Sequence, residues 1–217
     1  HGDVLMIGAM VGWSLLQLIQ YLSPELPGFL ALMLAIAGAI PVCVIVSVLI
    51  ERVAYRRLRD APRLAPLITA IGISILLQTL AMMIWKPNYK SYPTLLPSDP
   101  LHIGGAVITP TQVMILVFTA ISLAILMWVV NSTKLGRAMR ATSENPRVAA
   151  LMGVKPDMVI SATFIIGAVL ATIAGVMWAM NYGTAHHAMG FLPGLKAFTA
   201  AVFGGIGNDT LIGGTGD

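Results

Sequence analysis

The amino-acid sequence predicts an all-α protein, a polytopic bundle of transmembrane helices, and three observations lead to this fold class. Of the 217 residues, 57% are hydrophobic and only 10% are charged, whereas about a quarter of the residues in a soluble domain are charged. The apolar residues form long uninterrupted stretches, and a helix needs about 20 such residues to cross a bilayer. The Lys and Arg residues gather between these stretches, where they determine the orientation of a membrane protein.

Five stretches are predicted to cross the membrane, and they must do so as helices because a backbone in lipid has to satisfy its own hydrogen bonds. They are residues 4–22, 28–50, 66–85, 112–131 and 159–181. Each is long enough to span the bilayer with some tilt. The lipid bilayer is therefore the expected environment of most of the chain.

Two shorter segments are predicted to fold differently. Residues 197–207 (AFTAAVFGGIG) are too few and too rich in glycine for a full span. They favour a short C-terminal helix that is re-entrant or truncated. Residues 101–110 (LHIGGAVITP) contain a Gly-Gly pair between β-branched runs, which predicts a small hairpin.

Charge predicts the orientation of the bundle. Ten of the 13 Lys and Arg residues lie in two connecting segments, 51–65 and 132–157. Alternating spans place both segments on one side, and basic loops remain in the cytoplasm, so we expect both to be cytoplasmic. Segments 23–27, 86–111 and 182–196 then lie outside. Because the net charge of +4 is explained by these loops, no nucleic-acid partner is expected.

Segment 132–157 has the pattern of a short amphipathic helix held at the cytoplasmic surface. Asn145 is a good N-cap, and Pro146 suits the first helical position, where its missing N–H is no loss. Gly153 suits the left-handed position that ends a helix. A segment that only connected two spans would not need a capped helix of its own, although a plain connector is the alternative interpretation.

The stretch LGRAMRATSENPRVAALMGVKPD resembles the cytoplasmic coupling loop of ABC-importer permeases for branched-chain amino acids. HGDVLMIGAM, RLAPLITAIGISILLQ and GFLPGLKAFTAAVFGGIGN are similar to the same family. The resemblance covers residues 1–208 and implies a bacterial inner-membrane permease truncated at both ends. It also implies a role in the membrane pathway for branched-chain or related amino acids. The implied partners are a second permease subunit, cytoplasmic ATP-binding subunits and a periplasmic amino-acid-binding protein.

On the pattern of this family, the helix that docks on the ATPase is 146–152. The residues implied to couple the permease to the ATPases are Glu144, Asn145, Pro146, Arg147, Ala149, Ala150 and Gly153. The more general importer pattern is Glu-Ala-Ala, three residues and Gly. Counted back from Gly153, only Ala149 fits that pattern, so the role of the loop is implied more strongly than the role of any single charge.

Small residues one helical turn apart predict close packing between spans, because backbones can approach there in lipid. These residues are Gly8, Gly12, Gly167, Ala171 and Gly175. Apart from end positions such as Glu51, no Asp, Glu, Lys or Arg lies deep in a predicted span, which argues mildly against an ion-coupled carrier. Helix ends and small polar groups could then handle a zwitterionic substrate. The residues that line a substrate pathway are not predicted.

No enzymatic site is predicted. The sequence lacks a Gly-rich phosphate loop, His-Glu-x-x-His and Gly-x-Ser-x-Gly, so ATP hydrolysis is expected in partner subunits. Neither a cofactor nor a metal is expected in the permease interpretation.

The C-terminal stretch GGIGNDTLIGGTGD instead matches one calcium-binding nonapeptide, in which Asp209 would offer oxygen ligands. Because at least about three repeats are needed for stability, we expect residues 209–217 to be a divergent Gly/Asp-rich tail. The alternative functions are a membrane-anchored protein with C-terminal calcium repeats, and a channel or secondary transporter.

Overall fold

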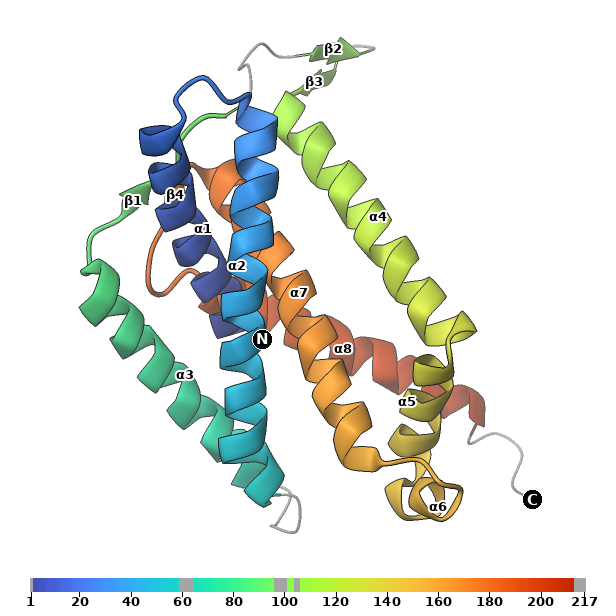
Figure 1. The fold of residues 1–217 in the computed structure, drawn as a ribbon. Coiled ribbons are helices and arrows are strands. Elements are labelled where there is room, and N and C mark those ends of the chain that lie inside the picture. Colours follow the sequence, from blue (N-terminus) through green and yellow to red (C-terminus); the bar gives the residue numbers. More distant parts are fainter. Residues whose placement is uncertain (1, 59–64, 96–100, 104–105, 213–217) are drawn as a thin grey trace.

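The computed structural model describes residues 2–58, 65–95, 101–103 and 106–212, and it is a bundle of long helices (Figure 1). Within this described part, five helices are long and apolar enough to cross a membrane. They are α1 (Gly2–Leu22), α2 (Gly28–Ile50), α3 (Ala65–Trp85), α4 (Pro110–Ser132) and α7 (Pro156–Tyr182). Each contains one predicted span, so the predicted all-α membrane bundle is confirmed.

Helices α1, α2 and α7 form the core of the bundle. The side chains of Met6, Met10 and Leu16 on α1 are fully buried. The small residues of α1 and α7 make this packing possible, because a Cβ on Gly8 would lie 2.8 Å from the Thr172 Cα.

Other predicted packing residues lie along the same contact between α1 and α7. A Cβ on Gly12 would lie 2.8 Å from Val176 Cγ2, and a Cβ on Gly175 would meet the carbonyl oxygen of Leu5. Ala171 is partly buried against the core, and Gly167 is half-buried. Gly8 and Gly175 therefore stand where the backbones of α1 and α7 approach closely, and Gly12 makes room for a side chain of α7.

Helices α3 and α4 flank this core on opposite sides (Figure 1). None of the residues of α4, all of which the structure describes, is buried. On α3, Ala81 is buried, with 2% of its surface exposed, while Ile75 and Met83 are more than half exposed. Apolar side chains that point away from the core suit a lipid environment, because their exposure to lipid tails costs no free energy of apolar hydration.

Helix α2 extends further than the sequence predicted. A π-helical turn, η1 (Glu51–Tyr55), and a 3₁₀ turn, η2 (Arg56–Leu58), continue it into the segment expected to be a loop. The Glu51 side chain is buried, and its Oε2 accepts a hydrogen bond from Ser161 Oγ at 3.0 Å. No Pro or Gly interrupts residues 51–58, so the helical conformation continues past the predicted end of the span. Arg59 and Arg63 lie outside the described residues.

The two basic segments lie at the same end of the bundle, the lower end in Figure 1. Arg56 Nη2 and Asp157 Oδ2 form an ion pair at 3.0 Å that joins them. This arrangement agrees with the alternation of spans from which their common side was predicted.

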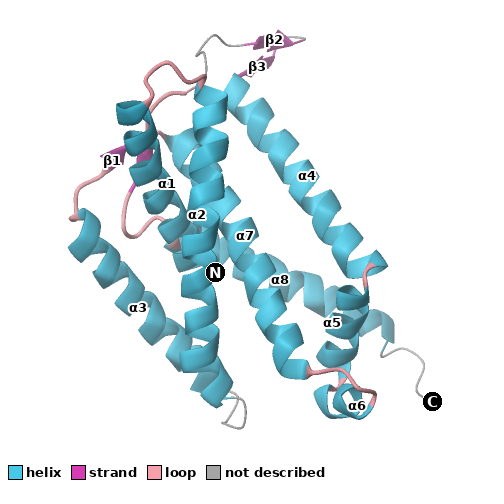
Figure 2. Ribbon diagram, viewed as in Figure 1, coloured by secondary structure: helices cyan, strands magenta, loops and turns pink. Residues whose placement is uncertain are grey.

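The opposite end carries the short strands (Figure 2). Strands β2 (Leu101–Ile103) and β3 (Ala106–Ile108) pair antiparallel, with Leu101 opposite Ile108. The predicted hairpin is therefore confirmed. The sequence did not predict β1 (Lys90–Ser91) and β4 (Thr184–Ala185), which pair antiparallel across a long stretch of chain.

The last helix, α8 (Phe191–Ile212), begins earlier and ends later than the predicted piece at 197–207. It begins beside the start of α1, where a Cβ on Gly2 would meet the Gly190 carbonyl oxygen. Pro193 fits because it lies in the first turn, where a helix does not need every N–H. Its apolar part, Phe191–Gly204, is shorter than the five spans. Residues 213–217 of the predicted tail lie outside the described residues.

Candidate functional site: a capped helix at the basic end and a polar cavity within the bundle

Helix α4 leads directly into the predicted coupling segment. Thr133 is the C-cap of α4 and also the N-cap of α5 (Lys134–Glu144). Its Oγ1 donates to the Val129 carbonyl at 2.6 Å and accepts from the Gly136 N–H at 3.1 Å. One residue therefore ends the span and starts the surface helix.

Helix α6 (Pro146–Leu151) comes after α5 and has a defined start. Asn145 Oδ1 accepts hydrogen bonds from the N–H groups of Arg147 at 3.1 Å and Val148 at 3.3 Å. Pro146 occupies the first turn. The predicted N-cap and first position are both confirmed.

The end of α6 is equally defined. Gly153 has a φ of 84°, the left-handed conformation that was predicted. The Val154 N–H donates to the Ala149 carbonyl and the Gly153 N–H donates to the Ala150 carbonyl, both at 3.1 Å. This pair of hydrogen bonds is the Schellman motif, which satisfies the last carbonyls of a helix. Helix α6 ends at Leu151 with Met152 as its C-cap, one residue before the predicted end.

The coupling residues implied by the resemblance do not all face the same way. Ala149 is 4% exposed and packs against the chain itself. The other six are exposed, namely Glu144, Asn145, Pro146, Arg147, Ala150 and Gly153.

The predicted amphipathic helix has an exposed apolar face, whose residues were not identified from the sequence. It consists of Val148, Leu151 and Met152, with 53%, 87% and 81% of their surfaces exposed, and we call it the outer face of α6. Its signal was present, because apolar residues three and four positions apart share one side of a helix.

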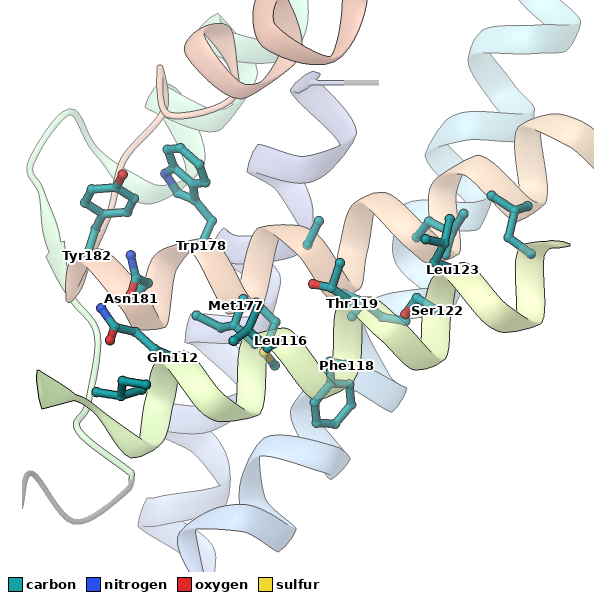
Figure 3. A pocket seen from close by; sticks show the side chains of 16 residues that line it. Gln112, Leu116, Phe118, Thr119, Ser122, Leu123, Met177, Trp178, Asn181 and Tyr182 are labelled. Carbon is teal, nitrogen blue, oxygen red and sulfur yellow. The ribbon is translucent and has the colours of Figure 1, made fainter. Parts of the chain in front are cut away.

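A mostly apolar groove of about 780 Å³ lies between α4 and α7 (Figure 3). Gln112 of α4 and Asn181 of α7 lie close to one another at one end, and Thr119 and Ser122 lie further along. None of these polar residues is ionisable. The groove therefore offers no charge to a polar ligand.

A second cavity, of about 450 Å³, is lined by residues of α1, α3 and α8. We call it the polar cavity. It contains an ionisable group, because Asp3 Oδ1 accepts hydrogen bonds from Ser74 Oγ at 2.9 Å and Gln78 Nε2 at 3.2 Å. Gln78 Nε2 also lies 3.1 Å from Ser74 Oγ. The remaining walls are Gly2, Ala70, Ile71, Ile75, Gly190, Phe191, Gly194 and Leu195.

Asp3 lies at the start of α1, but it contacts α3 away from the ends of that helix. Ser74 and Gln78 lie in the middle of α3, and the start of α1 packs beside them. The prediction concerned the interior of the spans, and Asp3 lies just before the predicted span 4–22, so it is not contradicted. Only the packing of α1 against α3 shows which part of α3 Asp3 contacts.

Within the described residues, no group of three or more His, Cys, Asp or Glu side chains could hold a metal ion. The backbone of Asp209, the calcium ligand of the alternative interpretation, belongs to α8. Helix α8 continues across residue 208 without a break. The separate tail at 209–217 stays a prediction.

The sequence matches the family described as branched-chain amino acid transport system, permease component, over residues 1–214. Among curated proteins, it is 40% identical over 213 residues to the high-affinity branched-chain amino acid transport system permease protein BraD of Pseudomonas aeruginosa. That similarity covers 96% of this chain and 69% of BraD.

Two further comparisons extend this finding. The chain is 37% identical over 221 residues to the permease protein LivH of the corresponding Escherichia coli system, covering 99% of this chain and 71% of LivH. It is 34% identical over 89 residues to the autoinducer 2 import system permease protein LsrC of Photorhabdus laumondii, covering 41% and 26% of the two chains. No solved structure matches the chain.

Proposed function

The chain belongs to the family of permease components of branched-chain amino acid transport systems, and we propose that it carries branched-chain or related amino acids as the permease subunit of an ABC importer. The family membership agrees with the resemblance of its coupling segment. We place the protein in a bacterial inner membrane, with segments 51–65 and 132–157 in the cytoplasm, because basic segments remain on that side.

The observation that carries this proposal is the construction of α6. Both of its ends are fixed by hydrogen bonds, and its apolar outer face is exposed at the basic end of the bundle. An exposed apolar face on a short rigid helix is suited to docking in a groove of a partner. We propose that this partner is a cytoplasmic ATP-binding subunit.

Helix α6 can transmit motion because only short connections join it and α5 to the spans on either side. Thr133 joins α5 to α4, and α7 begins at Pro156, shortly after Gly153. Closure of the ATPases would then move α5 and α6 together and shift the spans on either side. The further partners proposed are a second permease subunit and a periplasmic amino-acid-binding protein.

The proposal is tested with the complete importer, purified with its ATP-binding subunits. In Leu151→Asp, a charge replaces the most exposed apolar side chain of the outer face. We expect the variant to lose most of its ATP-binding subunits during purification and to lose leucine uptake. The matched control is Leu26→Asp, which makes the same change in the exposed loop at the opposite end of the bundle.

Leu26→Asp should retain its ATP-binding subunits. Equal retention of these subunits by both variants would contradict docking through α6. Uptake of leucine by the parental importer should stop when ATP is withheld, and uptake that continues would favour a channel or secondary transporter instead.

A further inference from the structure

We propose that the polar cavity between α1, α3 and α8 binds the transported amino acid during its passage, with the Asp3 carboxylate as the counter-ion of the substrate's ammonium group. The inference rests on the proposed function, and it adds a binding site and a recognised chemical group to it. No residue of this pathway could be predicted from the sequence alone.

The polar cavity lies away from the ends of α3. Asp3 bonds to Ser74 and Gln78, which lie in the middle of α3. Because α3 is one of the candidate spans, the cavity lies beside the middle of a membrane helix and not beside its end. Substrate sites of membrane transporters are commonly formed there, between helices from different parts of the chain.

The Asp3 carboxylate gives the cavity a negative charge that no cationic side chain among the described residues balances. Both hydrogen bonds to Asp3 go to Oδ1, and no described residue donates to Oδ2. No Lys or Arg among the described residues lies within ion-pair distance of this carboxylate. Arg56 forms its ion pair with Asp157, which does not line the cavity. An acidic group within a membrane protein is costly without a cationic partner and marks a functional site. A protonated amino group is a cation of suitable size for a cavity that already presents a carboxylate and a hydroxyl.

The other walls of the cavity suit an apolar side chain. Ile71 and Ile75 of α3 and Phe191 and Leu195 of α8 give it apolar walls. These four side chains are at least half exposed in the chain, so they are available to a ligand. The volume of about 450 Å³ is within the range of about 300–1,000 Å³ that is usual for small-molecule sites.

The end of the cavity beside α8 suits the carboxylate of the substrate. Gly190 and Phe191 line the cavity at the N-terminal end of α8, and a helix N-terminus favours negative charge. The cavity therefore combines an anionic wall, apolar walls and an electropositive helix end. This combination matches a zwitterion with an apolar side chain.

A purely structural role for Asp3 is the competing interpretation. An acidic residue in the first turn stabilises a helix through the helix dipole, and Ser74 and Gln78 would then only hold α1 against α3. The two interpretations differ in what they predict for transport by an importer that is assembled and hydrolyses ATP.

The test uses the complete importer in proteoliposomes with saturating leucine-loaded binding protein, and it measures leucine imported per ATP hydrolysed. In Asp3→Asn, the shape of the side chain is kept and its charge is removed. We expect leucine import per ATP to fall at least about tenfold, the loss expected when a charge-assisted hydrogen bond is removed. Assembly with the ATP-binding subunits and basal ATP hydrolysis should remain, and Asp3→Glu should restore most of the import.

A matched pair on α3 provides an independent measurement. Ser74→Ala removes a hydroxyl that faces the cavity, and Thr79→Ala removes one that bonds to the Ile75 carbonyl of its own helix. We expect about a two- to tenfold fall in import per ATP for Ser74→Ala and none for Thr79→Ala. This pair decides the question if Asp3→Asn does not assemble.

Parental import by Asp3→Asn, or equal import by the two α3 variants, would overturn the inference and leave the proposed function intact. Loss of assembly in both Asp3→Asn and Asp3→Glu, with no difference between the α3 variants, would establish the structural role instead. If the parental importer does not take up leucine, the proposed function itself fails.

Discussion

Helices α1 and α4 have similar lengths and apolar compositions, but they occupy different environments. Helix α1 supplies fully buried side chains such as Met6 and Met10, whereas none of the residues of α4, described throughout, is buried. The difference lies in small residues. Gly8 and Gly12 let α1 approach α7 closely, and α4 contains no glycine. Both helices are apolar. In lipid, close packing therefore distinguishes a core helix from a peripheral one, and apolar character does not.

The largest effect that we expect is from a bulky residue at the contact between α1 and α7. A Cβ at position 175 would meet the Leu5 carbonyl oxygen, so Gly175→Leu has to push two backbones apart. We expect a loss of more than about 3 kcal/mol of stability, measured by thermal unfolding of the purified protein in detergent.

The matched control is Ala120→Leu on α4, where the side chain is exposed. It should change stability by no more than about 0.5 kcal/mol. Similar unfolding temperatures for the two variants would remove the distinction between the core and peripheral helices.

A smaller effect is expected from the removal of a hydroxyl that donates a hydrogen bond to a buried side chain. Ser161 Oγ donates to the buried Glu51 Oε2 at 3.0 Å, and Ser161→Ala leaves that acidic group with one donor fewer. We expect a loss of about 1–3 kcal/mol, measured by the same unfolding experiment. Ser122→Ala, on the peripheral helix, should have an effect within about 0.5 kcal/mol, and an equal loss there would contradict the comparison.

The local features of the fold could be predicted from sequence, because their signals lie within a few residues. Asn145, Pro146 and Gly153 each act on the backbone next to them, so α6 was located to within one residue. Hydropathy located the five spans for the same reason, since each helix satisfies its own hydrogen bonds.

The features that join distant segments could not be predicted. Asp3 meets Ser74 and Gln78 across about a third of the chain, and only the packing of α1 against α3 brings them together. The same holds for the pairing of β1 with β4, which are two residues long and carry no strand signal of their own. The outer face of α6 is different, because an amphipathic helix was predicted in this segment and only the residues of its apolar face were not identified.

The end of α6 allows a test in which space and backbone conformation are separated. A Cβ on Gly153 or on Gly72 of α3 would meet nothing within 4 Å, but only Gly153 of this pair has a positive φ, at 84°. Gly153→Val should therefore cost about 1 kcal/mol through its backbone and lower leucine import per ATP by disturbing α6.

Gly72→Val should have no such effect on import. The comparison is made by ATP-dependent uptake in the complete importer. If Gly153→Val imports leucine at the parental rate, the left-handed end of α6 has no part in coupling.

The smallest expected effect concerns a polar group in the core. The Tyr92 hydroxyl is buried and has no hydrogen-bond partner among the described residues, and burial raises the pKa of this phenol. Because an unsatisfied buried hydroxyl costs free energy, Tyr92→Phe should leave stability unchanged or raise it by up to about 1 kcal/mol. A clear fall in the unfolding temperature would show that this hydroxyl forms a stabilising hydrogen bond in the folded protein.

Because Thr133 caps both α4 and α5, the number of residues at this junction determines how the two helices are oriented relative to each other. Each residue added to a helix rotates the next part of the chain by about 100° and advances it by about 1.5 Å. An insertion beside Thr133 would thus change the phase of α5 relative to α4, and it would separate Gly136 from the Val130 carbonyl oxygen against which it packs. Substitutions here alter single contacts, but an insertion or deletion resets the direction in which the whole surface segment points.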